Sequence, residues 1–178
     1  KSAMSRLNIA GDYKDLSADR RSEIDNTPEV KEATEQLLAR RKQVKSRYQT
    51  YRDARDDIRT NYKSLKQQAL ADLPLPEWRK RIGELNQLQA LELKRLDTDN
   101  SDMLDAFKDI EPNQSAFDRA LNDYMALIND PTLENLATGE YNFDERERRL
   151  ASLASLHGQD LIKEVETFLH ERDLPFEK

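Results

Sequence analysis

The chain has 178 residues, a net charge of −6 and no cysteine, which excludes disulfides and thiolate-bound metal ions. It contains no run of about 18 apolar residues, so no segment is expected to span a membrane as a helix. Only three valines and four glycines are present, whereas strands need β-branched residues and frequent turn residues. The composition therefore predicts an all-α protein.

The low apolar content indicates an elongated protein rather than a compact globule. Leu, Ile, Val and Phe make up about 22% of the chain, just above the level at which disorder becomes common. Helices that each bury one narrow stripe need less apolar surface than a globule does. Charge is also sorted along the chain: residues 31–96 carry sixteen Lys/Arg against nine Asp/Glu, and residues 97–178 carry eight against twenty. Such sorting concerns partners and self-association rather than the fold.

Residues 1–26 are expected to form a partly flexible arm with one short helix, because apolar side chains are sparse there. A long helix is expected to begin at Thr27-Pro28-Glu29 and to continue to about Ala71, roughly 65 Å at 1.5 Å per residue. Six side chains of this helix recur at seven-residue intervals: Val30, Leu37, Val44, Tyr51, Ile58 and Leu65. This seam predicts packing against another helix. The positions four residues later are largely polar, which favours a helical hairpin over a coiled-coil zipper.

The prolines of Asp72-Leu73-Pro74-Leu75-Pro76 are expected to end the first helix, and a second begins at Pro76-Glu77-Trp78. Its packing side is predicted to comprise Ile82, Leu85, Gln89, Leu93, Leu96, Met103, Phe107 and Ile110, with Leu88, Leu91 and Leu104 alongside. Residues 97–100 are a weak point that could break it. A short connection between two long helices favours antiparallel neighbours. Residues 27–111 are therefore predicted to form a long antiparallel helical hairpin, resembling a coiled coil.

Residues 112–178 are predicted to form a smaller acidic helical bundle, on or beside the hairpin. Glu111-Pro112 marks its first boundary and Asp130-Pro131 begins a brief helix. Residues 139–143 are expected to be a loop. The last helix is expected to run from about Asp144 to Arg172, with Gly158 kinking or splitting it.

A basic stripe on the first helix is the most specific binding signal. At 100° per residue, seven cations align within about 40° of one line. The basic stripe consists of Arg41, Lys45, Arg52, Arg55, Arg59, Lys63 and Lys66, with Tyr48 and Tyr62 beside it. It could follow a phosphate backbone while the tyrosines stack on bases. It could also be a solvated face, a seat for acidic helices of the chain, or the contact for an acidic partner protein.

The remaining candidates are weaker. Trp78 at the predicted hairpin turn is either an interface anchor or a staple that fixes the turn. The acidic run from Asp97 lacks the glycine and the closing Glu of a calcium loop. His157 is expected in the core and His170 on the polar face, in no metal-binding pattern. We therefore expect no cofactor, no metal site and no catalytic residue.

Two functions from different classes fit these patterns. The first is a non-enzymatic interaction, structural or adaptor protein that presents its helical hairpin to a protein partner or to another copy of itself. The alternative is a nucleic-acid-binding accessory protein that uses residues 41–66. An enzyme with a carboxylate cluster in a helical bundle is a third hypothesis that no motif signals. A cytoplasmic location is expected, because no signal-peptide core is visible.

Overall fold

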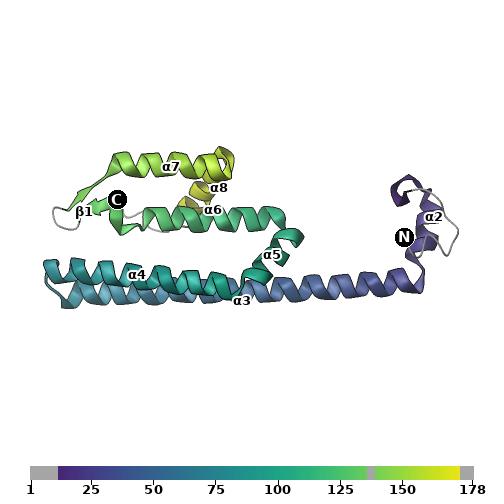
Figure 1. Cartoon of the computed structure of the whole chain (residues 1–178), viewed down its shortest axis with the longest axis horizontal. Helices are drawn as coiled ribbons and strands as arrows, with labels where there is room; N and C mark the ends of the chain where they lie inside the picture. The colour runs from purple at the N-terminus through teal and green to yellow at the C-terminus, as the bar shows by residue number, and fades with distance from the viewer. Residues whose placement is uncertain (1–11, 136–138, 173–178) are drawn as a thin grey trace. The chain divides into compact units, whose positions relative to one another are not determined.

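The structure is a computed structural model that describes residues 12–135 and 139–172 of the chain. Nearly all of these residues are helical, so the prediction of an all-α protein is confirmed. The elements are η1 (Tyr13–Asp15), α2 (Ala18–Asp25), α3 (Pro28–Asp72), α4 (Leu75–Asp99), α5 (Ser101–Ile110), α6 (Pro112–Ile128), η2 (Pro131–Leu133), β1 (Glu134–Asn135), β2 (Glu140–Tyr141), α7 (Phe143–His157) and α8 (Gln159–Glu171) (Figure 1). Here η denotes a 3-10 turn.

The chain divides into two compact units, residues 1–47 and 48–178, and the division falls within α3. The three segments expected from the sequence, 1–26, 27–111 and 112–178, stay a prediction. In the first unit the expected short helix is α2, whose first turn is capped by Ser17: its Oγ accepts from the Arg20 backbone N–H at 3.4 Å. The part of the expected arm before residue 12 lies outside the described residues.

Prolines mark the helix starts as the sequence predicts. Pro28 is the first residue of α3, Pro76 lies in the first turn of α4, and Pro112 begins α6. A proline fits there because its missing N–H is one that a first turn leaves unpaired in any case. The weak point expected at residues 97–100 is also observed, since Asn100 separates α4 from α5.

The core of the second unit lies among α6, α7 and α8. Ala120 and Tyr124 of α6 are buried together with three apolar side chains of α8: Ile162, Val165 and Leu169. Partly buried side chains of α7 pack against them, among them Leu150 and Leu153. All three helices contact one another (Figure 1).

The segment between η2 and α7 differs from the expected loop. Residues 134–135 pair with residues 140–141 as two antiparallel strands, in the register Glu134 to Tyr141 and Asn135 to Glu140. The Asn142 backbone N–H donates to the Leu133 carbonyl at 2.7 Å, and Leu133 itself is fully buried. Strands of two residues are too short to show an alternating pattern, which is why the sequence indicates only a loop.

Gly158 splits the last predicted helix into α7 and α8. Its backbone has φ +94° and ψ 138°, a conformation that only glycine adopts without strain. A Cβ added at this position would meet no atom within 4 Å, so a substitution would act through the backbone alone.

We therefore expect Gly158→Ala to lower the free energy of unfolding by about 1–3 kcal/mol, the usual cost of a strained backbone position. Urea denaturation followed by circular dichroism measures this loss. The control is Ser155→Ala at an exposed position of α7, expected to change stability by less than about 0.5 kcal/mol. Equal effects of the two substitutions would contradict the strain argument.

Candidate functional site

The structure distributes the basic stripe between two environments. Arg41, Lys45 and Lys63 are exposed, whereas Arg52, Arg55, Arg59 and Lys66 are half-buried. Tyr48 and Tyr62 are buried, with exposed fractions of 6% and 8%. The tyrosines are therefore not available to stack on bases, which removes one of the two elements of the nucleic-acid hypothesis.

Tyr48 joins α3 to α5 and α6. Its hydroxyl donates a hydrogen bond to Oδ2 of the buried Asp118, whose other oxygen accepts from Gln114 Nε2 at 3.0 Å. Its ring stacks on Phe107, with centroids 3.5 Å apart and planes inclined by 3°. Burial, with the hydrogen bond to Asp118, raises the pKa of Tyr48 well above 10.0. The side chain is thus neutral and serves packing.

Arg55 belongs to a network of three residues between α3 and α4. Its guanidinium donates to Asp97 Oδ1 and, at 2.8 Å, to Tyr51 Oη. The Tyr51 hydroxyl in turn donates to the same Asp97 oxygen at 2.7 Å. Burial and the hydrogen bond to Asp97 raise the pKa of Tyr51 to about 12. Asp97, which the sequence places in an acidic run, is the counter-ion of Arg55.

Two further cations of the stripe contact side chains of the same unit. Arg59 donates to Asn122 Oδ1 of α6 at 2.7 Å, and burial lowers its pKa below the usual value for arginine. Lys66 donates to Gln89 Oε1 of α4 at 2.8 Å. Arg55, Arg59 and Lys66 therefore contact other helices of the second unit, through one carboxylate and two neutral amide side chains.

Trp78 lies in the first turns of α4 and is half-buried. Its Nε1 is buried and finds no hydrogen-bond partner among the described residues. An indole at an interface usually has a partner for this donor. The burial of Trp78 favours a role in fixing the turn. Its unpaired Nε1–H keeps the alternative, an interface anchor, as a hypothesis.

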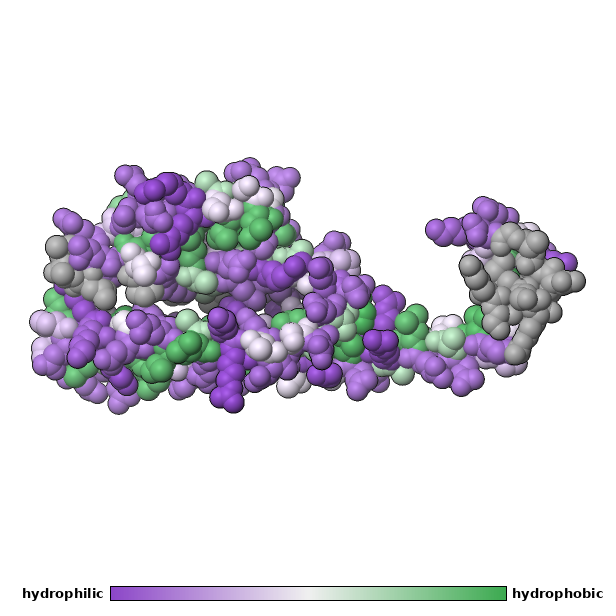
Figure 2. All heavy atoms as spheres, viewed as in Figure 1, coloured by the Kyte–Doolittle hydropathy of each residue, from purple (hydrophilic) through white to green (hydrophobic). Residues whose placement is uncertain are grey.

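Exposed leucines on α3 and α4 are the feature that the sequence missed. In the second unit, five of them are at least one-third exposed: Leu65 (36%), Leu70 (61%), Leu75 (57%), Leu88 (48%) and Leu91 (65%). The sequence places Leu88 and Leu91 alongside the packing side of α4, which is wrong, since neither is covered. Hydrophobic patches interrupt the hydrophilic surface over these helices in Figure 2. The seven-residue spacing identified a seam but could not show where the seam ends.

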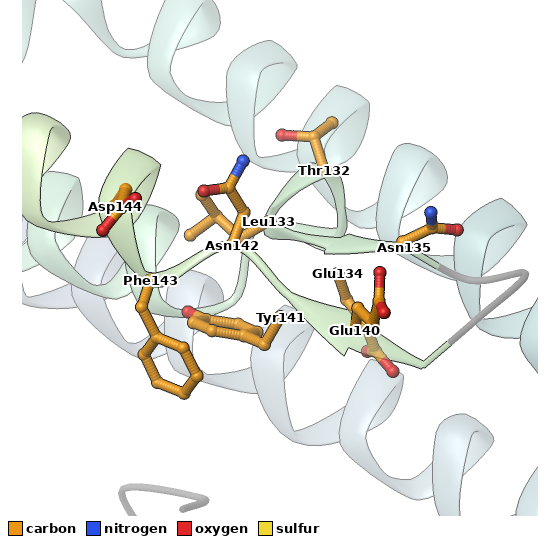
Figure 3. A pocket seen from close by; sticks show the side chains of 9 residues that line it. All are labelled: Thr132, Leu133, Glu134, Asn135, Glu140, Tyr141, Asn142, Phe143 and Asp144. Carbon is orange, nitrogen blue, oxygen red and sulfur yellow. The ribbon is translucent and has the colours of Figure 1, made fainter.

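A cavity of about 700 Å³ opens at the strand pair β1–β2 (Figure 3). It is lined by Thr132, Leu133, Glu134, Asn135, Glu140, Tyr141, Asn142, Phe143 and Asp144. The Tyr141 and Phe143 rings meet edge to face with centroids 4.8 Å apart, and Phe143 is 67% exposed. The lining combines acidic side chains, whose carboxylates are possible general bases, with aromatic rings.

The histidines and carboxylates are placed as single contacts rather than as clusters. His157, expected in the core, has a side chain 13% exposed and contacts Asp123 through Nε2 at 2.8 Å. No group of three or more His, Asp or Glu side chains in residues 12–135 and 139–172 is placed to hold a metal ion. Among the helices of that same part, none is both long enough and apolar enough to cross a membrane.

Comparisons of the chain with protein-family models, with curated proteins and with solved structures found no match. Its function must therefore be argued from the residues themselves.

Proposed function

We propose that this chain is a non-enzymatic interaction or adaptor protein. In this proposal it presents a long antiparallel helical hairpin, followed by a smaller bundle, to a protein partner or to another copy of itself. The observation that carries the proposal is the set of leucines left uncovered on α3 and α4. Contiguous exposed apolar surface in a chain this hydrophilic is typical of a docking face.

Two contacts support the antiparallel arrangement of α3 and α4 in the second unit. Tyr51 contacts Asp97, and Lys66 contacts Gln89, so residue numbers rise along one helix as they fall along the other. The contact between Lys66 and Gln89 also brings their preceding neighbours, Leu65 and Leu88, to the same level of the two helices. Leu91 follows one turn after Leu88 on α4. These three leucines are the docking face of the proposal.

The double variant Leu88→Glu/Leu91→Glu tests this face. Because both side chains are exposed, the variant is expected to fold with unchanged helicity and to lose the protein partner that the wild-type chain captures. Leu156→Glu is the matched control, since Leu156 is 72% exposed on α7 and lies outside the docking face. Quantitative affinity capture with the full chain as bait, together with light scattering, measures both forms of association.

We expect captured proteins that persist in Leu156→Glu and disappear in the double variant. A wild-type chain that stays monomeric at high concentration and captures nothing would overturn the proposal. Capture of the same proteins by the double variant would overturn this docking face.

The nucleic-acid alternative has less support. Arg55 and Arg59 of the basic stripe contact Asp97 and Asn122, so the exposed cations are no longer a continuous line. Arg41 and Lys63 remain exposed, and they are where charge reversal would test salt-sensitive binding without disturbing the fold. The cytoplasmic location expected from the sequence belongs to the proposal as well.

A further inference from the structure

The first unit contains a helical segment with two uncovered leucines at its centre. This segment comprises residues 28–47 of α3, about 30 Å of helix at 1.5 Å per residue. Leu37 and Leu38 lie at its centre, and each is 57% exposed. Hydrophobic surface is visible on this part of α3 in Figure 2 as well.

Leu37 lies on a line that is buried further along the same segment. Val44, seven residues after Leu37, is 8% exposed. A seven-residue seam that is buried at Val44 and bare at Leu37 is a packing surface that the described residues leave uncovered at Leu37. The segment is long enough for about three heptads, which a second helix could cover.

Charges on the segment are arranged with opposite signs on either side of the two leucines. Before them lie Glu29, Glu32 and Glu35, against a single Lys31; after them lie Arg40, Arg41, Lys42, Lys45 and Arg47. A parallel copy of this helix would bring each charge beside its like. An antiparallel copy brings the acidic half of each helix, with a net charge of −2, beside the basic half of the other, with a net charge of +5.

We propose that residues 28–47 form a two-fold, antiparallel contact with the same segment of a second copy. This inference rests on the proposed interaction function and names one partner for it. Centred on Leu37 and Leu38, the contact pairs residues whose numbers sum to about 75, as a self-complementary two-fold interface requires. Leu37 and Leu38 then meet their counterparts near the axis, and Glu35 lies within reach of Lys42 on the other copy.

The basic excess of the segment sets the strength of this contact. Six cations against three carboxylates leave each copy positive, so two copies repel at long range even though their halves attract. Two leucines per copy also make an interface smaller than the roughly 1,600 Å² of a standard one. The dimer is therefore weak, concentration-dependent and strengthened where salt screens the net repulsion.

Exchanging the charges of a proposed pair distinguishes this contact from non-specific association. Glu35→Lys alone and Lys42→Glu alone each place like charges together at two symmetric positions, and each is expected to weaken dimerisation measured by sedimentation equilibrium about three- to tenfold. The double variant Glu35→Lys/Lys42→Glu recreates both pairs in reversed sense and is expected to return to within about twofold of the wild-type chain. Failure of the double variant to recover would overturn the pairing.

The apolar centre is tested by Leu37→Glu/Leu38→Glu, expected to weaken the dimer by at least about tenfold. The matched control is Leu88→Glu/Leu91→Glu, which leaves residues 28–47 intact and is expected to retain the dimer. A dimer lost in the control and kept in Leu37→Glu/Leu38→Glu would overturn this inference and support the docking face on α4 instead. A chain that is monomeric at high concentration yet captures another protein would also overturn it, while leaving the interaction function standing.

Orientation has its own measurement, because the chain contains no cysteine. Leu38→Cys lies at the proposed axis and is expected to form a disulfide-linked dimer under mild oxidation. Val30→Cys lies far from its counterpart in the antiparallel contact and is expected to stay unlinked alone but to link to Lys45→Cys when the two variants are mixed. Efficient self-linking of Val30→Cys would indicate a parallel dimer and contradict the proposal.

Discussion

Arg55→Glu is expected to lower the free energy of unfolding by roughly 2–3 kcal/mol. The Arg55 side chain is 11% exposed, and the substitution would set a carboxylate against Asp97 and withdraw a donor from Tyr51. Breaking a fully buried ion pair costs about 3–5 kcal/mol, and the smaller figure follows because the Asp97 side chain is 41% exposed to water. Urea denaturation monitored by circular dichroism gives the value.

Lys63→Glu provides the matched control. It reverses a charge of the same basic stripe, two turns further along α3, at an exposed position. A surface substitution of this kind changes stability by less than about 0.5 kcal/mol. If Arg55→Glu were as mild as Lys63→Glu, the contact with Asp97 would contribute nothing to the fold and Arg55 would again be free to bind a partner.

The outcome for Arg55 illustrates what the sequence could and could not predict. The 100° spacing correctly places the cations on one face of a helix, because that is a local property of α3. Their partners lie far away in the chain: Asp97 is 42 residues and Asn122 is 63 residues from the arginine that it contacts. Periodicity carries no information on such distant pairs, so the same stripe was compatible with a nucleic acid, a solvated face or an internal contact.

Helix boundaries were predictable because their signals are local in the sequence. Pro28, Pro112 and Gly158 act through their own backbone, and each lies where a helix begins or ends. Leu88 and Leu91 mark the limit of this reasoning. A helix of mixed sequence carries leucines on its surface as well as in its core, and spacing alone does not separate an apolar residue that is buried from one that awaits a partner.

Alkaline pH is expected to unfold the protein through its buried tyrosines. Burial raises the pKa of Tyr51 and of Tyr124 to about 12, with Asp97 and Glu166 contributing by hydrogen bonding and charge. Both tyrosines ionise near pH 10 in the unfolded chain. Their contribution to stability is therefore complete below pH 10 and is lost between pH 10 and 12. Each tyrosine that ionises only on unfolding lowers the free energy of unfolding by about 1.4 kcal/mol per pH unit in this window.

Urea denaturation at a series of pH values, with tyrosinate absorbance recorded in parallel, measures this loss. Tyr124→Phe removes one titrating group from the core of α6 and α8, so its stability is expected to fall less steeply than that of the wild-type chain above pH 10. Tyr141→Phe, at the strand pair, is the matched control and is expected to keep the steep fall because Tyr51 and Tyr124 are still present. Parallel curves for wild type and Tyr124→Phe would mean that Tyr124 ionises without unfolding, and hence that the core around it admits water in the native state.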